Sequence, residues 1–266
     1  LAARYRLLYD EALFTRTGFL AGDDDRRAAE LLAAMQHPDV RAIICARGGH
    51  GALRLLPRLP LDAIAASQRT LVGFSDITAL HAAWTRAGLA SIHGPVVTHL
   101  GALGPTAAAD LFAALEDPAP PPPFTDLQAI APGRAAGPAV GGNLEVLSRL
   151  VGTPYLPPLD GAVLFLEEIG ERPYRLDRLL VHLRLAGALD RLAAVVIGDL
   201  VRCEEPAEGS VEPLAAMAAV LGTLGIPVVA GAPFGHGDRN RCFPLGVRAI
   251  VDADAGSVTF ESGAVS

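Results

Sequence analysis

The sequence predicts an α/β protein with an N-terminal, doubly wound, mainly parallel (flavodoxin-like) sheet domain and a smaller C-terminal α/β domain that ends in a β-hairpin. Three observations predict this class: apolar β-branched runs alternate with helical patterns, a proline run interrupts the alternation, and the alternation then resumes. The 266 residues are enough for two cores. We therefore expect an N-terminal domain over residues 1–116, a proline-rich linker over 117–140 and a C-terminal domain over 141–266.

The first half of the chain combines strand patterns with helical patterns. An acidic turn followed by apolar residues at helical spacing predicts a helix that stops at His37, before a proline. Two β-branched runs predict strands, one leading into the glycine-rich "RGGHG" and the other into Ser75. The expected helices cover residues 21–37, 52–59 and 77–88, and the expected strands cover 40–46 and 70–74.

The second half begins after "DPAPPPPFT", a stiff, extended spacer that can form neither helix nor central strand. The uncharged stretch from Pro213 to Phe234 approaches the length of a membrane span, but glycines and prolines interrupt it, so we expect a helix and a buried strand there. The expected helices cover 141–155, 174–189 and 214–225; the expected strands cover 161–171, 192–200 and 226–231, before a hairpin over 247–260 that turns at Ala255-Gly256.

Composition excludes several kinds of function. With 22 basic and 29 acidic side chains the net charge is −7, so the chain would on average repel a nucleic acid. All the basic residues are arginine, and the absence of lysine excludes a Walker A site, Schiff-base chemistry and a Ser-Lys dyad. Cys45, Cys203 and Cys242 lack the spacing of a zinc site and suit a reducing compartment. We expect no metal, no cofactor, no membrane contact and a cytoplasmic location.

Four glycine-rich or polar loops follow expected strands, at the sheet edge where ligands of open α/β sheets bind. Ser75, in "GFSDIT", stands at a strand-to-helix junction that can present a nucleophile, although Ile77 departs from Gly-x-Ser-x-Gly and a helix N-cap is the ordinary alternative. The glycines of "RGGHG" can offer N–H groups to an oxyanion or a phosphate. The other two loops are "LEEIGE" and "FGHGD".

A nucleophilic serine needs a histidine base and an orienting carboxylate. His236 lies in the most permissive loop, "FGHGD", and three further histidines in expected loops remain candidates: His50, His93 and His99. His37, His81 and His182 fall at a helix end or inside helices, where a structural role is expected. Glu167 and Glu168 end a strand and point to opposite faces, so one of them can serve; Glu171 is more distant, and a salt bridge to Arg175 or Arg178 is the alternative role.

Seven successive blocks of the sequence resemble the LD-carboxypeptidase family of serine peptidases, which also contains the microcin C immunity peptidases. The resemblance covers nearly the whole chain and keeps the blocks in order. The blocks are "AGDDDRRAAELLAAMQHPDVRAIICARGGHGALRLLP", "LVGFSDITALHAAW", "HGPVV", "GGNLEVLSRLVGTPY", "LFLEEIGERPYRLDRLL", "GAPFGHG" and "FPLGVRA".

The resemblance implies a nucleophile, Ser75, a carboxylate, Glu167, and a base, His236, all three in a cleft between the domains. It also implies an oxyanion hole formed by the N–H of Asp76 and that of Gly48 or Gly49. Contacts to the substrate are expected from Arg47, His50 and Asn143, and the cation for its terminal carboxylate from Arg47, Arg172, Arg175 or Arg239. Members of the family usually carry tyrosine where His50 stands, so local contacts to the substrate can differ. They also begin with a strand and a loop upstream of "LAARYRLL", so the start of this chain looks truncated.

The implied reaction is hydrolysis of the L,D peptide bond that releases terminal D-alanine from cytoplasmic murein tetrapeptides, by a homodimer that needs no cofactor. Two alternatives remain open. One is an immunity-type peptidase that cleaves a peptidyl nucleotide and stacks the base on an aromatic side chain; the only tryptophan, Trp84, falls in an expected helix, and a phenylalanine or tyrosine can take that role instead. The other is a non-catalytic protein that binds a small ligand in the same cleft.

Overall fold

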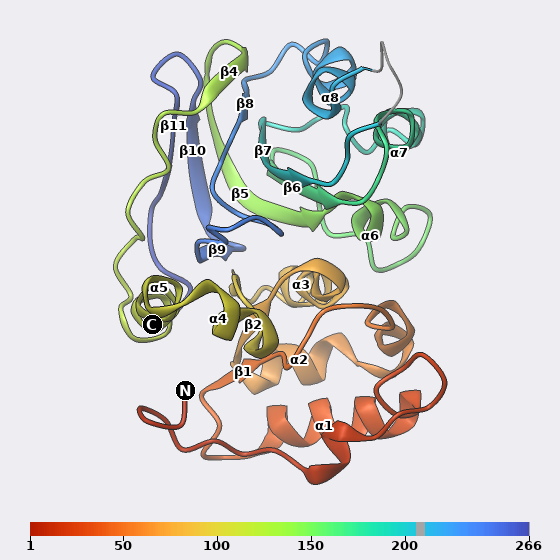
Figure 1. Ribbon diagram of the computed structural model, residues 1–266, viewed down its shortest axis with the longest axis vertical. Coiled ribbons are helices and arrows are strands. Elements are labelled where there is room, and N and C mark those ends of the chain that lie inside the picture. The colour runs from red at the N-terminus through yellow and green to blue at the C-terminus, as the bar shows by residue number, and fades with distance from the viewer. Residues whose placement is uncertain (206–210, 266) are drawn as a thin grey trace.

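The computed structural model describes residues 1–205 and 211–265, which form two β-sheets with helices packed against them (Figure 1). The first sheet has the order β1-β2-β3-β9. Its first three strands are parallel, and β9, from the end of the chain, pairs antiparallel with β3. The strands are β1 (Ala42–Ile44), β2 (Thr70–Gly73), β3 (Ser91–His93) and β9 (Phe243–Leu245).

Helices from the first half of the chain accompany this sheet, and their ends follow from the sequence. The first α-helix begins where the Asp23 carboxylate accepts the Arg26 N–H at 2.8 Å, and it ends at His37, before Pro38. The segment predicted as a helix over 52–59 is a 3-10 helix, in which Pro57 lacks the N–H that an α-helix would use. The helices are η1 (Glu11–Phe14), α1 (Asp24–Gln36), η2 (Leu53–Arg58), α2 (Leu61–Ser67), η3 (Ser75–Ile77), α3 (Thr78–Arg86), α4 (Val97–Leu103) and α5 (Pro105–Glu116).

The second sheet has the order β11-β10-β5-β6-β7-β8-β4 and curls around the upper half of the molecule (Figure 1). Its central strands β5 to β8 are parallel, and antiparallel strands extend it on both sides. The strands are β4 (Gln128–Ala131), β5 (Arg134–Asn143), β6 (Val163–Ile169), β7 (Ala194–Val201), β8 (Val228–Ala230), β10 (Arg248–Asp252) and β11 (Ser257–Phe260). The helices are α6 (Leu144–Ser148), α7 (Pro173–Leu185) and α8 (Pro213–Leu221).

The predicted α/β class is confirmed, including the parallel N-terminal sheet and the terminal hairpin, whose turn holds Gly256 at φ 60°. The second sheet has seven strands and the first four, whereas the sequence predicted the C-terminal part to be the smaller. The extra strands include β4 and β5, which begin inside residues 117–140, where proline and glycine obscure the strand pattern. The division into two domains and a linker stays a prediction.

Strand β9 comes from the second half of the chain but pairs with β3 of the first sheet (Figure 1). An aromatic cluster joins the two sheets there. The Phe243 ring lies 4.8 Å from that of His93 in the first sheet and 4.7 Å from that of Phe165 in the second, measured between centroids. Phe234 packs on Phe243 at 4.9 Å. This packing fixes the loop after Phe234 beside the end of β2. In the described ranges, no helix is both long and apolar enough to cross a bilayer.

Candidate active site

Ser75 sits on a tight turn between β2 and α3. Phe74 is extended at φ −157°, and Ser75 then adopts a left-handed φ of 64°, which costs a non-glycine residue about 1 kcal/mol or more. Gly48 leaves the room for this turn, since a Cβ on it would lie 3.0 Å from the Ser75 Cβ. The strained turn lifts a partly exposed hydroxyl out of the end of the strand, as a nucleophile elbow does.

The side chains of Ser75, His236 and Glu167 form a hydrogen-bonded chain in this order. The Ser75 Oγ lies 3.0 Å from His236 Nε2, and His236 Nδ1 lies 2.7 Å from Glu167 Oε2. The Glu167 side chain is fully buried, whereas 16% of the His236 side chain is exposed. In the tautomer with hydrogen on Nδ1, the imidazole donates to the carboxylate and accepts the hydroxyl hydrogen through Nε2. The arrangement can therefore remove a proton from Ser75 and hold the imidazolium that results.

Two buried groups surround the carboxylate of Glu167. The Asn143 amide Nδ2 donates to Glu167 Oε1 at 3.2 Å and to Glu168 Oε1 at 2.9 Å. The sequence predicted that Glu167 and Glu168 point to opposite faces of the strand, yet both carboxylates reach the Asn143 amide. The pairing of β6 with β7 shifts register between Leu166 and Glu168, which breaks the regular alternation. Burial is the main cause that raises the pKa of Glu168 to about 7, and the neighbouring Glu167 charge adds to it.

The loop that carries His236 is shaped by glycines and by Asp199. Gly235 has a φ of 124°, and a Cβ on it would lie 3.0 Å from both Cβ and Oε2 of Glu167. The Gly237 N–H donates to Asp199 Oδ2 at 3.0 Å. Burial raises the pKa of Asp199, and this N–H opposes the shift. The loop thus has no space for a side chain where it passes the buried carboxylate.

Gly235→Ala should lower kcat/KM at least about tenfold, because its methyl group displaces Glu167 as well as straining the backbone. Gly231→Ala is the matched control: Gly231 has a φ of 86°, and a Cβ there meets nothing within 4 Å. Both variants should lose about 1 kcal/mol of unfolding free energy in urea titrations. Equal kcat/KM values for the two variants would contradict the packing argument.

The groups expected to bind an oxyanion lie around Ser75. The N–H groups of Gly48 and Gly49 have no hydrogen-bond partner among the described residues, and Asp76, near the start of η3, has an N–H that the helix leaves free. The buried Asp76 carboxylate accepts the Ala52 N–H at 2.8 Å, which fixes the turn to the segment after "RGGHG". Burial raises the pKa of Asp76, and that N–H counteracts it.

The residues expected to contact substrate take different positions. Arg47 and His50 are exposed, and the His50 ring lies 5.6 Å from that of Phe19. Asn143 is buried beneath Glu167, and its amide is engaged in the bonds described above. Of the other arginines considered for the substrate carboxylate, Arg172 pairs with Glu205 and Arg175 with Glu171, whereas Arg239 is exposed and has no ion pair within the described part of the chain.

The remaining histidines do not join the Ser75–His236–Glu167 chain. His93, expected in a loop, belongs to β3 and is fully buried with neither ring nitrogen hydrogen-bonded, and burial places its pKa well below the usual value. His99, also expected in a loop, lies in α4 and stacks on Phe74 at 5.0 Å. His81, in α3, donates through Nε2 to the Gly73 carbonyl at 2.9 Å, and its Nδ1 lies 2.8 Å from the Ser91 hydroxyl; burial lowers its pKa to about 4.

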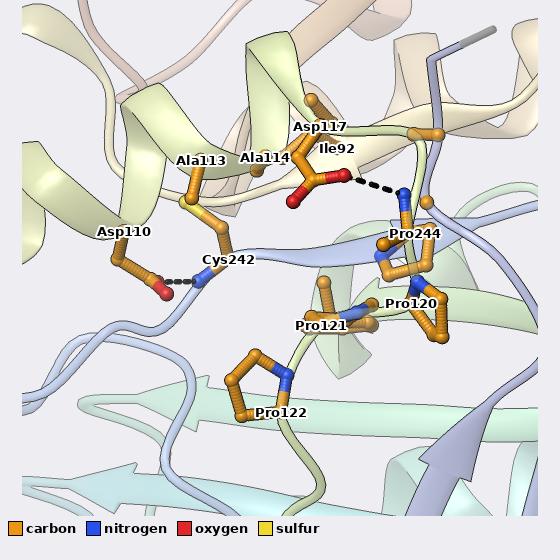
Figure 2. A pocket seen from close by; sticks show the side chains of 14 residues that line it. Ile92, Asp110, Ala113, Ala114, Asp117, Pro120, Pro121, Pro122, Cys242 and Pro244 are labelled. Carbon is orange, nitrogen blue, oxygen red and sulfur yellow. Dashed lines mark hydrogen bonds between the residues drawn. The ribbon is translucent and has the colours of Figure 1, made fainter.

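A small pocket of about 80 Å³ lies elsewhere, between α5, the proline run and β9 (Figure 2). The Cys242 N–H donates to Asp110 at 2.5 Å on its wall, and three prolines close one side. None of Ser75, Glu167 or His236 lines it. In the described residues, no group of three or more His, Cys, Asp or Glu side chains is arranged to hold a metal ion.

Sequence reasoning missed the link between the nucleophile turn and the second sheet. The Thr78 hydroxyl donates to the Ser75 carbonyl at 2.7 Å and accepts the Asn143 N–H at 2.9 Å. Gly142, at φ 136°, allows this approach, since a Cβ on it would lie 2.4 Å from Thr78 Oγ1. The consecutive glycines before Asn143 were the available signal of a close backbone approach.

Two family models match the chain: the LD-carboxypeptidase N-terminal domain over residues 2–94 and the LD-carboxypeptidase C-terminal domain over residues 136–251. The murein tetrapeptide carboxypeptidase of Pseudomonas aeruginosa is 34% identical over 90% of this chain and 81% of its own length. The crystal structure of a muramoyltetrapeptide carboxypeptidase from Oxalobacter formigenes superposes with a TM-score of 0.88 at 29% identity, covering 100% of this chain and 93% of that one. The microcin C7 self-immunity protein of Escherichia coli is 26% identical over 89% of this chain and 78% of its own length.

Proposed function

The chain belongs to the LD-carboxypeptidase family, and from this premise we propose that it is a serine carboxypeptidase that releases terminal D-alanine from murein tetrapeptides by hydrolysing an L,D peptide bond. The observation that carries the proposal is the hydrogen-bonded chain from the Ser75 hydroxyl through His236 to the buried Glu167, with links of 3.0 and 2.7 Å. A hydroxyl, an imidazole and a carboxylate in this order form the unit that activates a serine for acyl transfer.

In the proposed mechanism, Ser75 Oγ attacks the carbonyl carbon of the scissile bond while His236 Nε2 takes the hydroxyl proton. Glu167 stabilises the imidazolium, which then gives its proton to the departing D-alanine nitrogen as the C–N bond breaks. Water, deprotonated by His236, attacks the acyl-enzyme and releases the shortened peptide and the Ser75 hydroxyl. The N–H of Asp76 and that of Gly48 or Gly49 stabilise the oxyanion; their unbonded state supports this assignment.

The substrate's terminal carboxylate requires a cation, and we assign it to Arg47 or Arg239. Both are exposed, and neither makes an ion pair among the described residues, while Arg172 and Arg175 already pair with glutamates. Arg47 directly precedes Gly48, where an added Cβ would lie 3.0 Å from the Ser75 Cβ, and Arg239 follows His236 by three residues. A cytoplasmic location and a homodimer complete the proposal; light scattering tests the dimer.

The proposal is tested by incubating the protein with murein tetrapeptide, with a D,D-linked pentapeptide and with a peptidyl nucleotide, and measuring released D-alanine or nucleotide. We expect D-alanine from the tetrapeptide alone. Cleavage of the peptidyl nucleotide alone would favour the immunity-type activity. Trp84 is fully buried, so in that case a phenylalanine or tyrosine would have to stack on the base. Binding of the tetrapeptide without release would favour a non-catalytic ligand-binding protein.

A further inference from the structure

Glu168 is a buried carboxylate that the proposed mechanism does not use. Only 2% of the residue is exposed, yet no arginine or histidine forms an ion pair with it in the described ranges. Its oxygens instead accept three N–H groups: Oε1 from Asn143 Nδ2 at 2.9 Å and from its own neighbour Ile169 at 2.8 Å, and Oε2 from Glu145 at 2.8 Å. All three of these hydrogen-bond partners are donors, which suits an acceptor-only, ionised side chain.

Keeping a carboxylate there destabilises the fold. Burial without a cation is the main reason that the pKa of Glu168 rises to about 7. An apolar side chain of similar size would avoid that desolvation but would leave the three N–H groups without an acceptor. One of these donors is the amide that also holds Glu167, and this shared amide links Glu168 to the site.

Asn143 provides the route from Glu168 to the site. Its Nδ2 carries two hydrogens, one directed to Glu168 and the other to Glu167. Its Oδ1 accepts the Val146 N–H at 3.1 Å, so a flipped amide would lose this bond and turn its oxygen toward two carboxylates. The bonds to Val146 and Glu168 together hold the amide in the one orientation in which it can also hold Glu167.

We propose that Glu168 is a positioning residue that locks the Asn143 amide, which in turn holds the Glu167 carboxylate in line with His236. The inference rests on the proposed function, because it assigns Glu168 a role only through the Ser75–His236–Glu167 unit. The two adjacent glutamates of "LFLEE" therefore have different roles: Glu167 hydrogen-bonds to the His236 imidazole, and Glu168 aligns Glu167.

Glu168→Gln tests this role, because the NH₂ of the new glutamine must face one of the three N–H groups that the carboxylate now accepts. Two donors that face each other cannot form a hydrogen bond. Two rates are measured: D-alanine release, and inactivation by a small fluorophosphonate, in which Ser75 Oγ bonds to phosphorus, fluoride leaves and His236 takes the proton. The variant should lower kcat and the inactivation rate about 10- to 100-fold with KM within about twofold. Glu261→Gln is the matched control, because its exposed side chain pairs with Arg248 and takes part in none of the hydrogen bonds of the site; both of its rates should stay within about twofold of wild type.

A double-mutant cycle separates positioning from a general structural effect. In a Glu167→Gln background, adding Glu168→Gln should change the inactivation rate less than about twofold, because the group it aligns is already lost. Asn143→Ala, which deletes the bridging amide, replaces Glu168→Gln in the cycle if that variant does not fold. An unchanged inactivation rate in Glu168→Gln, or an additive loss in the cycle, overturns the inference. A wild-type protein that reacts with fluorophosphonate but releases no D-alanine refutes the substrate alone, and the cycle still decides the role of Glu168.

Discussion

Ser75→Ala should lower kcat/KM for D-alanine release by on the order of 10⁴ or more, with binding of the tetrapeptide largely retained. In the proposed mechanism the variant lacks the atom that attacks the substrate, and the neighbouring His236 cannot replace it. The methyl group of alanine fits the space that Gly48 leaves beside the Ser75 Cβ, so the turn should keep its shape. Stopped assays of D-alanine and calorimetric titration of the peptide measure the two effects separately.

The control for this variant is Ser262→Ala, which removes an exposed hydroxyl whose only partner in the described structure is the carbonyl of Gly263. It should keep the wild-type kcat/KM within about twofold. Turnover by Ser75→Ala within tenfold of wild type would reject Ser75 as the nucleophile. Loss of peptide binding together with turnover would mean that the turn itself, and not the hydroxyl, had been damaged.

Local patterns predicted most of the α/β alternation. The helix over Asp24–Gln36 combines an acidic cap, helical spacing and a proline stop within a short stretch, and all three are local signals. The strands β6 and β7 are apolar runs buried on both faces, which is typical of the centre of a parallel sheet. Such elements need no knowledge of their partners to be predicted.

Other elements depend on partners that the sequence does not display. β5 contains Pro138 and several glycines, and it is a strand because β6 and β10 flank it. β9 is three residues long and joins the first sheet although it comes from the end of the chain. Its pairing with β3 depends on an aromatic cluster drawn from three distant segments.

The candidate site was likewise predictable only in part from local patterns. Ser75 and His236 each follow an expected strand and Glu167 lies toward the end of one, and these positions made them candidates before their distances were known. Residue reasoning alone left Glu167 and Glu168 equivalent, because it assumed regular strand alternation, and the register shift after Leu166 breaks that regularity. Resemblance to the family favoured Glu167, the carboxylate that lies 2.7 Å from His236.

Glu167→Gln should lower kcat/KM about 10³- to 10⁴-fold, although it changes no more than an oxygen to an amide nitrogen. If the new NH₂ donates to His236 Nδ1, the imidazole carries its hydrogen on Nε2 and cannot accept the Ser75 proton. If the amide oxygen faces Nδ1 instead, the tautomer is right but the negative charge that stabilises the imidazolium is missing. Either orientation therefore lowers kcat, and peptide binding should remain.

Glu171→Gln is the matched comparison, because Glu171 follows the same strand and pairs with Arg175 at the surface end of α7. It should retain kcat/KM within a few-fold, since its charge lies outside the hydrogen-bonded chain that runs from Ser75 to Glu167. The reverse result, an inactive Glu171→Gln beside an active Glu167→Gln, would move the orienting role to Glu171 and remove the reason for burying Glu167. Side chains of equal chemistry on one strand end thus differ in expected effect by three or more powers of ten, because only one of them is held, fully buried, against the imidazole.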